Sequence, residues 1–216
     1  MNVEIKTLKD HVYDYIAELI AKGEMSDTEK ITEQQVCDAL GVSRTPVREA
    51  LIQLAADGYL ESIPRRGFFV QHLSENKARE VIEILGPLDG RAAYLAVPYI
   101  SDADIEQMHL LQESIDLAID KGLYRLHDEL QAKFHDCYHA RCGNQRLVGY
   151  IHQLNRFFIR RETGTMEETA LVRNLRKANE EHAEIVRLLE SRDAAGVQNY
   201  IRDVHWSIDI AKTFVW

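Results

Sequence analysis

The first part of the chain carries its hydrophobic residues at the spacing of three successive helices. Thr32 and Gln35 have the identity and spacing of a capping box, which predicts a short helix that begins after Thr32 and runs through Leu40. Gly41 then supplies a residue suited to a left-handed helix end. The helices on either side each carry one apolar stripe. These stripes are Leu8, Val12, Tyr15, Ile16, Leu19 and Ile20 in the first helix and Val47, Ala50, Leu51 and Leu54 in the third.

After these helices the pattern changes to two short runs that are rich in β-branched and aromatic residues. The runs are residues 59–63 and 68–71, and they flank Pro-Arg-Arg-Gly at positions 64–67. Two such runs around a turn predict a β-hairpin, here with a basic tip. Three helices followed by a two-stranded hairpin, or wing, describe a winged helix-turn-helix. We therefore predict this domain over residues 1–71.

The third predicted helix has a polar front at its N-terminal end. Ser43 or Thr45 can cap it, and Pro46 falls in the first turn, where a missing N–H costs nothing. Arg44, Thr45 and Arg48 lie off the apolar stripe and face outward. A helix with a packed back and hydroxyl and guanidinium groups at its start suits the major groove of DNA. The alternative is a solvated surface helix that carries two arginines.

From about residue 75 onward the pattern is helical throughout. We predict a linker at residues 72–76 and an all-α bundle over residues 77–216, so that the protein as a whole is mainly α. Six helices with short connections account for the pattern. Their expected ranges are 77–97, 101 to beyond 115, 124–141, 145 to about 161, 168–191 and 193 to about 213, with Ser101 as an N-cap.

Composition bears on where the protein resides and on how it meets DNA. No apolar run approaches a membrane span and the N-terminus lacks a signal-peptide pattern, so we expect a cytoplasmic protein without membrane contact. Its three cysteines are expected to be reduced thiols.

The net charge is −9, and residues 1–71 hold eight Lys and Arg against twelve Asp and Glu. Positive charge gathers at Arg44, Arg48, Arg65 and Arg66, which predicts affinity that depends on specific contacts and dimerisation.

The segment from Gly41 to Leu51, with Leu54, Asp57-Gly58 and the 64–67 turn, resembles the DNA-binding domain of GntR-family bacterial transcription regulators. One departure is residues 25–30, where many members have a Pro-Gly turn. The resemblance implies a homodimer that places two recognition helices on a pseudo-palindromic, double-stranded operator. Arg44 and Arg48 would read bases, and the other contacts would hold the DNA backbone or the minor groove. The expected DNA-binding set is Ser43, Arg44, Thr45, Pro46, Arg48, Arg65, Arg66 and Gly67.

The second half of the chain resembles the FCD-type ligand-binding domain of the FadR subgroup of these regulators. With the N-terminal match, the resemblance covers nearly the whole chain. It implies that the helical domain binds a small metabolite and forms the dimer. The residues that carry it are 88–96, Phe134-His135 followed by Gly143-Asn144, Glu181-His182, Asp193 and His205.

Many domains of this type hold a divalent metal with one Asp and three histidines. The resemblance places His135, His182 and His205 at the histidine positions, and such a set suits Zn²⁺, Ni²⁺ or a similar ion. The Asp position is Gln131, whose amide is a poor ligand for these metals. Asp128 lies on the same helix face and is a candidate substitute. Three alternatives stay open, namely a weaker three-histidine site, a site completed by an external carboxylate, and no metal.

The expected effector is a carboxylate, although the usual clamp for one is missing. Relatives that bind sugar acids or hydroxy acids often carry an Arg where this chain has Leu85. They also carry a Glu where this chain has Asp89. Arg156, Arg160 and Arg161 could supply a clamp, because guanidinium groups bind carboxylates bidentately, or they could be surface residues. We expect three other histidines of this half, namely His127, His139 and His152, to be solvated or simply hydrogen-bonded.

These observations favour a transcriptional repressor whose operator binding responds to a metabolite in the helical domain. A first alternative keeps DNA binding but makes the helical half only a dimerisation module, since Gln131 and Leu85 replace two expected ligand-recognition residues. A second alternative is a metal-dependent hydrolase or oxygenase that uses the three histidines. The sequence argues against an enzyme, because it contains neither an H-E-x-x-H motif nor a nucleophile elbow.

Overall fold

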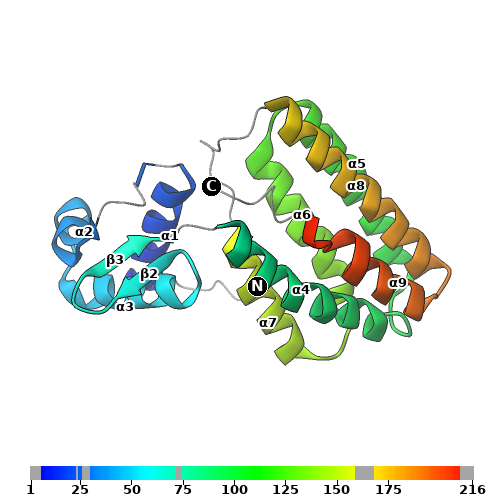
Figure 1. Cartoon of the computed structure of the whole chain (residues 1–216), viewed down its shortest axis with the longest axis horizontal. Coiled ribbons are helices and arrows are strands. Elements are labelled where there is room, and N and C mark those ends of the chain that lie inside the picture. The colour runs from blue at the N-terminus through cyan, green and yellow to red at the C-terminus, as the bar shows by residue number, and fades with distance from the viewer. Residues whose placement is uncertain (1–5, 23, 26–29, 72–73, 159–167, 210–216) are drawn as a thin grey trace. The chain divides into compact units, whose positions relative to one another are not determined.

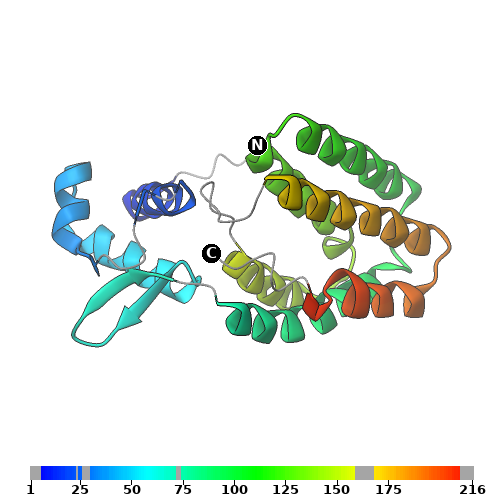
Figure 2. The same cartoon turned by 45° about the horizontal axis from the view of Figure 1, so that its top comes forward.

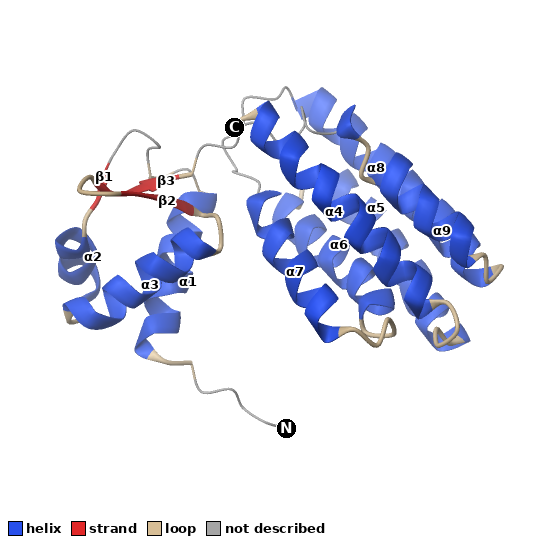
Figure 3. Ribbon diagram, turned by 60° about the horizontal axis from the view of Figure 1, so that its bottom comes forward, coloured by secondary structure: helices blue, strands red, loops and turns tan. Residues whose placement is uncertain are grey.

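The computed structural model describes the chain except for residues 1–5, 23, 26–29, 72–73, 159–167 and 210–216 (Figure 1). Contacts group these residues into two compact units. Of the described residues, the first unit holds those up to Ser74 and the segment 155–158, and the second unit holds the rest. Strands occur only in the first unit among the residues described (Figure 3). The protein is mainly α-helical, as the sequence predicts.

The first unit is the predicted winged helix-turn-helix. Its helices are α1 (Leu8–Ala21), α2 (Glu33–Leu40) and α3 (Arg44–Ala56), and its strands are β1 (Lys30–Ile31), β2 (Leu60–Ile63) and β3 (Gly67–Val70). The strands form an antiparallel sheet in the order β1-β3-β2. The prediction of a two-stranded wing therefore missed β1. Its two residues are too few to show a periodic pattern, and they gain strand structure by pairing with Phe68 and Phe69 of β3.

The helix signals of the first unit are largely confirmed. Thr32 and Gln35 form a reciprocal capping box, and Gly41 ends α2 in the left-handed conformation with φ of 65°. Ser43 is the N-cap residue of α3, but its side chain makes no capping hydrogen bond. The complete apolar stripe of α3 is buried in the core. In α1, however, Leu8 is 58% exposed, because it lies in the first turn, beyond the reach of the core.

The second unit is a bundle of helices. Figure 2 shows α8 lying along α5 and α9 beside α4, and α5 also packs against α6. Ser101 caps α5 through a second capping box, with Asp104. The helices are α4 (Glu75–Ala96), α5 (Asp102–Asp120), α6 (Tyr124–His139), α7 (Gln145–Asn155), α8 (Glu168–Glu190) and α9 (Ala194–Tyr200).

Two of the predicted helices differ from the observed ones. The predicted helix from residue 145 to about 161 ends as α7 at Asn155 and is followed by a short 3-10 turn, η1 (Arg156–Phe158). The last predicted helix gives way after Tyr200 to a π-helical turn, η2 (Ile201–His205), in which the Trp206 N–H donates to the Ile201 carbonyl at 2.9 Å. A π turn accommodates an extra residue and is frequent at functional sites. This wider turn sets the position of His205.

Two further features of the described residues concern the length and apolarity of the helices and the state of the cysteines. None of the helices in the described part of the chain is both long and apolar enough to cross a membrane. Cys37, Cys137 and Cys142 are all free thiols, as expected.

Candidate nucleic-acid interface and metal centre

The N-terminal end of α3 presents the residues expected to contact DNA. Ser43, Arg44, Thr45 and Arg48 are exposed, and Pro46 is half-buried. Their exposure follows from the burial of the opposite face of the helix in the core. The structure thus brings two guanidinium groups and two hydroxyl groups to one end of one helix, where unpaired N–H groups and the helix dipole also favour an anion.

Both arginines are positioned by side chains from the start of α2. The Arg44 guanidinium donates to Gln34 Oε1 at 2.8 Å, and Arg48 donates to the two carboxylate oxygens of Glu33 at 2.6 and 3.2 Å. The hydrogen bonds from Arg48 hold the pKa of the Glu33 carboxyl below its usual value. Because the Arg48 side chain is largely exposed, this pair adds little to stability. Its effect is to orient the guanidinium group.

The tip of the wing is a tight turn with two exposed arginines. Arg66 N donates to the Ile63 carbonyl at 3.0 Å, and Arg65 occupies the left-handed region with φ of 64°. Gly67 has φ of 104°, and a Cβ there would lie only 2.6 Å from Lys30 Cε. Glycine is favoured at this position by its conformation, since the flexible end of the Lys30 side chain could move away from a Cβ. The Arg66 guanidinium lies over the Phe69 ring, 5.3 Å from its centroid.

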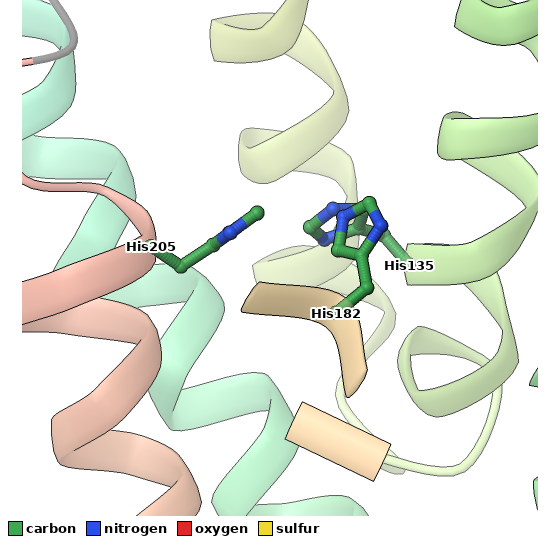
Figure 4. A group of neighbouring side chains, drawn as sticks. All are labelled: His135, His182 and His205. Carbon is green, nitrogen blue, oxygen red and sulfur yellow. The ribbon is translucent and has the colours of Figure 1, made fainter. Parts of the chain in front are cut away.

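Three histidines from three different elements meet inside the second unit. His135 lies on α6, His182 on α8 and His205 in the π turn η2, and their rings point toward one another (Figure 4). The ring centroids form a nearly equilateral triangle with sides of 5.3, 5.2 and 5.1 Å. One ligand nitrogen from each ring lies within 4.8 Å of the other two, and all three residues are buried.

Hydrogen bonds to the Nδ1 atoms fix how these rings are protonated. Tyr138 donates its hydroxyl hydrogen to Asp89, so its oxygen accepts from His135 Nδ1, 2.6 Å away. His182 Nδ1 donates to Asn179 Oδ1 at 3.2 Å, and His205 Nδ1 donates to Glu181 Oε2 at 3.1 Å. A neutral imidazole with its proton on Nδ1 carries a free lone pair on Nε2.

The free nitrogens are those that a cation would use. Among the described residues, His135 Nε2 and His182 Nε2 are the buried side-chain atoms without a hydrogen-bond partner. Buried polar atoms are almost always satisfied, so two such atoms facing one space call for an explanation. Burial lowers the pKa of His135 and lowers that of His182 strongly, which keeps both rings neutral. Neutral imidazoles anchored through Nδ1 are suitable ligands for a divalent metal.

A buried carboxylate connects this cluster to its surroundings. Oδ1 of Asp89, on α4, accepts hydrogen bonds from Tyr138 at 2.9 Å and His139 Nε2 at 2.8 Å. Its Oδ2 accepts from Trp206 Nε1 at 2.7 Å and lies 3.3 Å from His135 Nδ1. Burial opposes its charge, but the bonds from His135 and His139 hold the Asp89 pKa well below the usual value. The carboxylate is thus ionised and ties α4 to α6 and to the residue after His205.

Comparison with known proteins identifies the family. Residues 8–70 match the model of the bacterial regulatory proteins of the gntR family, and residues 80–204, more than half of the chain, match the FCD domain. The chain belongs to the gntR family of regulators. As a gntR-family protein with an FCD domain, it is a DNA-binding transcriptional regulator and not an enzyme.

Individual relatives agree with this assignment. The regulator is 28% identical over 148 residues to the HTH-type transcriptional regulator YdhC of Bacillus subtilis, a match that covers 66% of this chain and 64% of YdhC. It is 39% identical over 90 residues, 42% of this chain and 40% of the relative, to a Paenarthrobacter nicotinovorans protein named "Probable D-xylose utilization operon transcriptional repressor". These matches span less than two thirds of each relative. E. coli McbR/YncC shares the fold, with a TM-score of 0.76 at 21% identity over 97% of this chain and 99% of that chain.

The other candidate residues of the sequence analysis lie in different environments in the regulator. Asp128 does not join the three histidines, because it is bonded to His127 Nδ1 at 2.8 Å, and Gln131 is half-buried on α6. Leu85 is fully buried in the core. Arg156 begins the η1 turn, but its side chain, like the residues Arg160 and Arg161, lies outside what the structure describes.

The structure also reveals contributions that the sequence interpretation did not assign. His127 and His139 are buried and hydrogen-bonded rather than solvated, whereas His152 is exposed. Asp89 and Asn179 support the cluster through hydrogen bonds, as does Glu181. Glu181 is next to His182 in the sequence, which is a local sign that it belongs to the cluster. Asp89 contacts residues about fifty positions later in the chain, and such contacts leave no local sign in the sequence.

The stability of the regulator's helical unit should depend on pH through His139. Although burial lowers the pKa of this histidine, hydrogen bonds to Asp136 and Asp89 raise it to about 9. Because this lies above the unfolded value of about 6.5, the stabilisation is complete below that pH and is lost as pH rises through 9, with a total of roughly 3 kcal/mol. We expect urea unfolding in chelator to show this loss between pH 6.5 and 9.5. The His139→Gln variant should lack it, and an equal loss in both proteins would contradict the assignment.

Proposed function

We propose that this regulator is a homodimeric repressor that reads a pseudo-palindromic operator with the N-terminal end of α3. The observation that carries the proposal is the exposed group formed by Ser43, Arg44, Thr45 and Arg48 on a helix whose opposite face is buried. Arg44 and Arg48 are oriented by α2 side chains, so they meet base edges with little loss of side-chain freedom. The name of the Paenarthrobacter relative supports repression.

In this proposal the wing holds the DNA backbone. Arg65 and Arg66 are exposed at the tip, and the adjacent Gly67 has no side chain, so the turn can approach the phosphates or the minor groove closely. Pro46 lies in the first turn of α3, where a missing N–H costs nothing, and helps to set the orientation of that turn. The acidic character of the chain means that these few cations supply most of the local attraction to phosphate.

The helical unit is proposed to bind a small carboxylate at a metal held by His135, His182 and His205. Two buried Nε2 atoms without a partner, those of His135 and His182, and the ring of His205 beside them support Zn²⁺ or Ni²⁺ as the ion. A bound metal would supply positive charge and open coordination positions for a carboxylate oxygen. Gln131 contributes no charge, so an external carboxylate takes the place of the missing Asp ligand.

A second candidate keeps DNA binding but treats the helical unit as a dimerisation module alone. The burial of Leu85 favours it, because a core leucine stands where relatives that bind acids carry an Arg. The two candidates differ in one measurable respect, since only the first predicts that metal and carboxylates change the regulator's stability and operator affinity.

The proposal is tested by selecting sequences from a random DNA pool with the full-length protein. We expect enrichment of a pseudo-palindrome whose half-sites lie about one helical turn apart, because a two-fold dimer places its recognition helices on one face of the duplex. A pool that shows no enriched motif would refute sequence-specific binding. An enriched motif without symmetry would refute the proposed homodimer while leaving the role of α3 intact.

A further inference from the structure

A second group of possible metal ligands lies beside the three-histidine cluster, one helical turn further along α6, where the His139 ring centroid is 6.1 Å from that of His135. It consists of Asp136 and His139 from α6 and His152 from α7. Asp136 Oδ1 lies 3.3 Å from His139 Nδ1 and 2.9 Å from His152 Nε2, and the two imidazole centroids are 5.7 Å apart. None of these three atoms belongs to the proposed inner site.

The distances match those between ligands of one metal ion. Zn²⁺ bonds to histidine nitrogens and carboxylate oxygens at about 2.0–2.2 Å. Two such ligands on one ion are therefore separated by roughly 2.9–3.6 Å, depending on whether the coordination is octahedral or tetrahedral. The carboxylate oxygen of Asp136 already lies at such distances from both imidazole nitrogens.

The buried histidine of this group is anchored from behind. His139 Nε2 donates to Asp89 Oδ1 at 2.8 Å, which leaves Nδ1 directed at Asp136. A carboxylate that holds the far nitrogen of a histidine is the usual support for a metal-bound imidazole. His152 and Asp136, in contrast, have side chains that are 46% and 52% exposed, so a cation can enter from solvent. One fixed ligand and two accessible ligands form an open site.

We propose that Asp136 Oδ1, His139 Nδ1 and His152 Nε2 form a second divalent-metal site, suited to Zn²⁺ or Ni²⁺, in which water completes the coordination. The cation takes the place of the proton between His139 and Asp136 and releases it to solvent. Asp89 contacts His139 of this outer site and His135 of the inner cluster, so one buried carboxylate supports both. The outer site does not require the inner one to bind metal.

The test counts Zn²⁺ bound to the full-length protein after chelator treatment and dialysis against a fixed concentration of free Zn²⁺. The wild type is expected to hold two ions per chain, and His152→Ala is expected to hold one. His152 is exposed, so its replacement should leave the fold intact, which the thermal midpoint of the metal-free protein verifies. His109→Ala is the matched control, because His109 is also an exposed histidine bonded to one carboxylate, Glu190, at 2.9 Å. That variant should hold two ions.

The outcomes separate the outer site from the proposed inner one. If the wild type and His152→Ala bind the same number of ions, the outer site is refuted. If His182→Ala loses one ion and the His152→Ala, His182→Ala double variant binds none, both sites are supported. One ion in the wild type, retained by His182→Ala and lost in His152→Ala, would support the outer site and refute the inner one.

Discussion

Replacing Asp89 with alanine should destabilise the helical unit by about 3–5 kcal/mol, the range found when one partner of a buried ion pair is removed. The Asp89 side chain is fully buried and accepts hydrogen bonds from Tyr138, His139 and Trp206. Its loss leaves three buried donors unsatisfied and takes from His139 one of the two carboxylates that favour its charged form. Urea unfolding of the full chain, followed by tryptophan fluorescence, measures the change.

Two further variants make the Asp89 result specific. Asp89→Asn retains the volume and two acceptor lone pairs but not the charge, so its cost should be smaller than that of alanine. Asp120→Ala removes an exposed carboxylate that is paired with Arg176, and such surface changes usually stay within about 0.5 kcal/mol. A loss for Asp89→Ala as small as that of Asp120→Ala would show that the buried network does not stabilise the fold.

Replacing His182 with alanine should remove metal binding at the inner site. His182 supplies one of the two buried nitrogens that lack a partner, so its loss leaves two imidazoles, which are too few for a stable site. The loss of a mere supporting partner already costs about 10–100-fold in metal affinity, and the loss of a direct ligand should cost more. The experiment is best done with His152→Ala as the parent protein, so that the outer site does not contribute.

Thermal and urea unfolding with and without Zn²⁺ provide the measurement for His182. In the parent, Zn²⁺ at 100 times its dissociation constant should raise the free energy of unfolding by about 2.7 kcal/mol. In the His182→Ala variant the same concentration should have almost no effect. His182 also stacks on Phe134 with centroids 4.2 Å apart, so its removal leaves a cavity. Comparing each protein with its own metal-free state cancels that cost. Equal stabilisation of both proteins would contradict the role of His182.

The elements of the DNA-binding unit could be predicted from the sequence because their signals are local. The capping box of Thr32 and Gln35, Gly41 and the stripe of α3 each lie within a few residues, and the structure confirms them. β1 could not be predicted, because it is a strand only through its pairing with β3. The prediction that Leu8 packs in the core was wrong, because a periodic stripe does not reveal where the core ends.

The candidate metal centre was only partly predictable. His135, His182 and His205 were chosen by resemblance to FCD domains, and the structure brings these three together. The π turn that positions His205 depends on backbone hydrogen bonds that leave no hydrophobic period. The role of Asp89 depends on side chains that are far from it in sequence and close to it only in the folded unit. Long-range polar networks of this kind have no signature in a single sequence.

The central claim is that the start of α3 reads DNA sequence, and the most direct test compares specific with non-specific binding at one salt concentration. Fluorescence anisotropy should be used to measure the affinity of wild type, Arg44→Ala and Arg79→Ala for the selected operator and for a scrambled duplex. Arg79 is bonded to Glu75 on α4, so it controls for the loss of one positive charge. We expect Arg44→Ala to lower operator affinity by about 1–3 kcal/mol per half-site, with little change on the scrambled duplex, whereas Arg79→Ala matches wild type. An Arg44→Ala protein that kept the wild-type ratio of specific to non-specific affinity would contradict the claim.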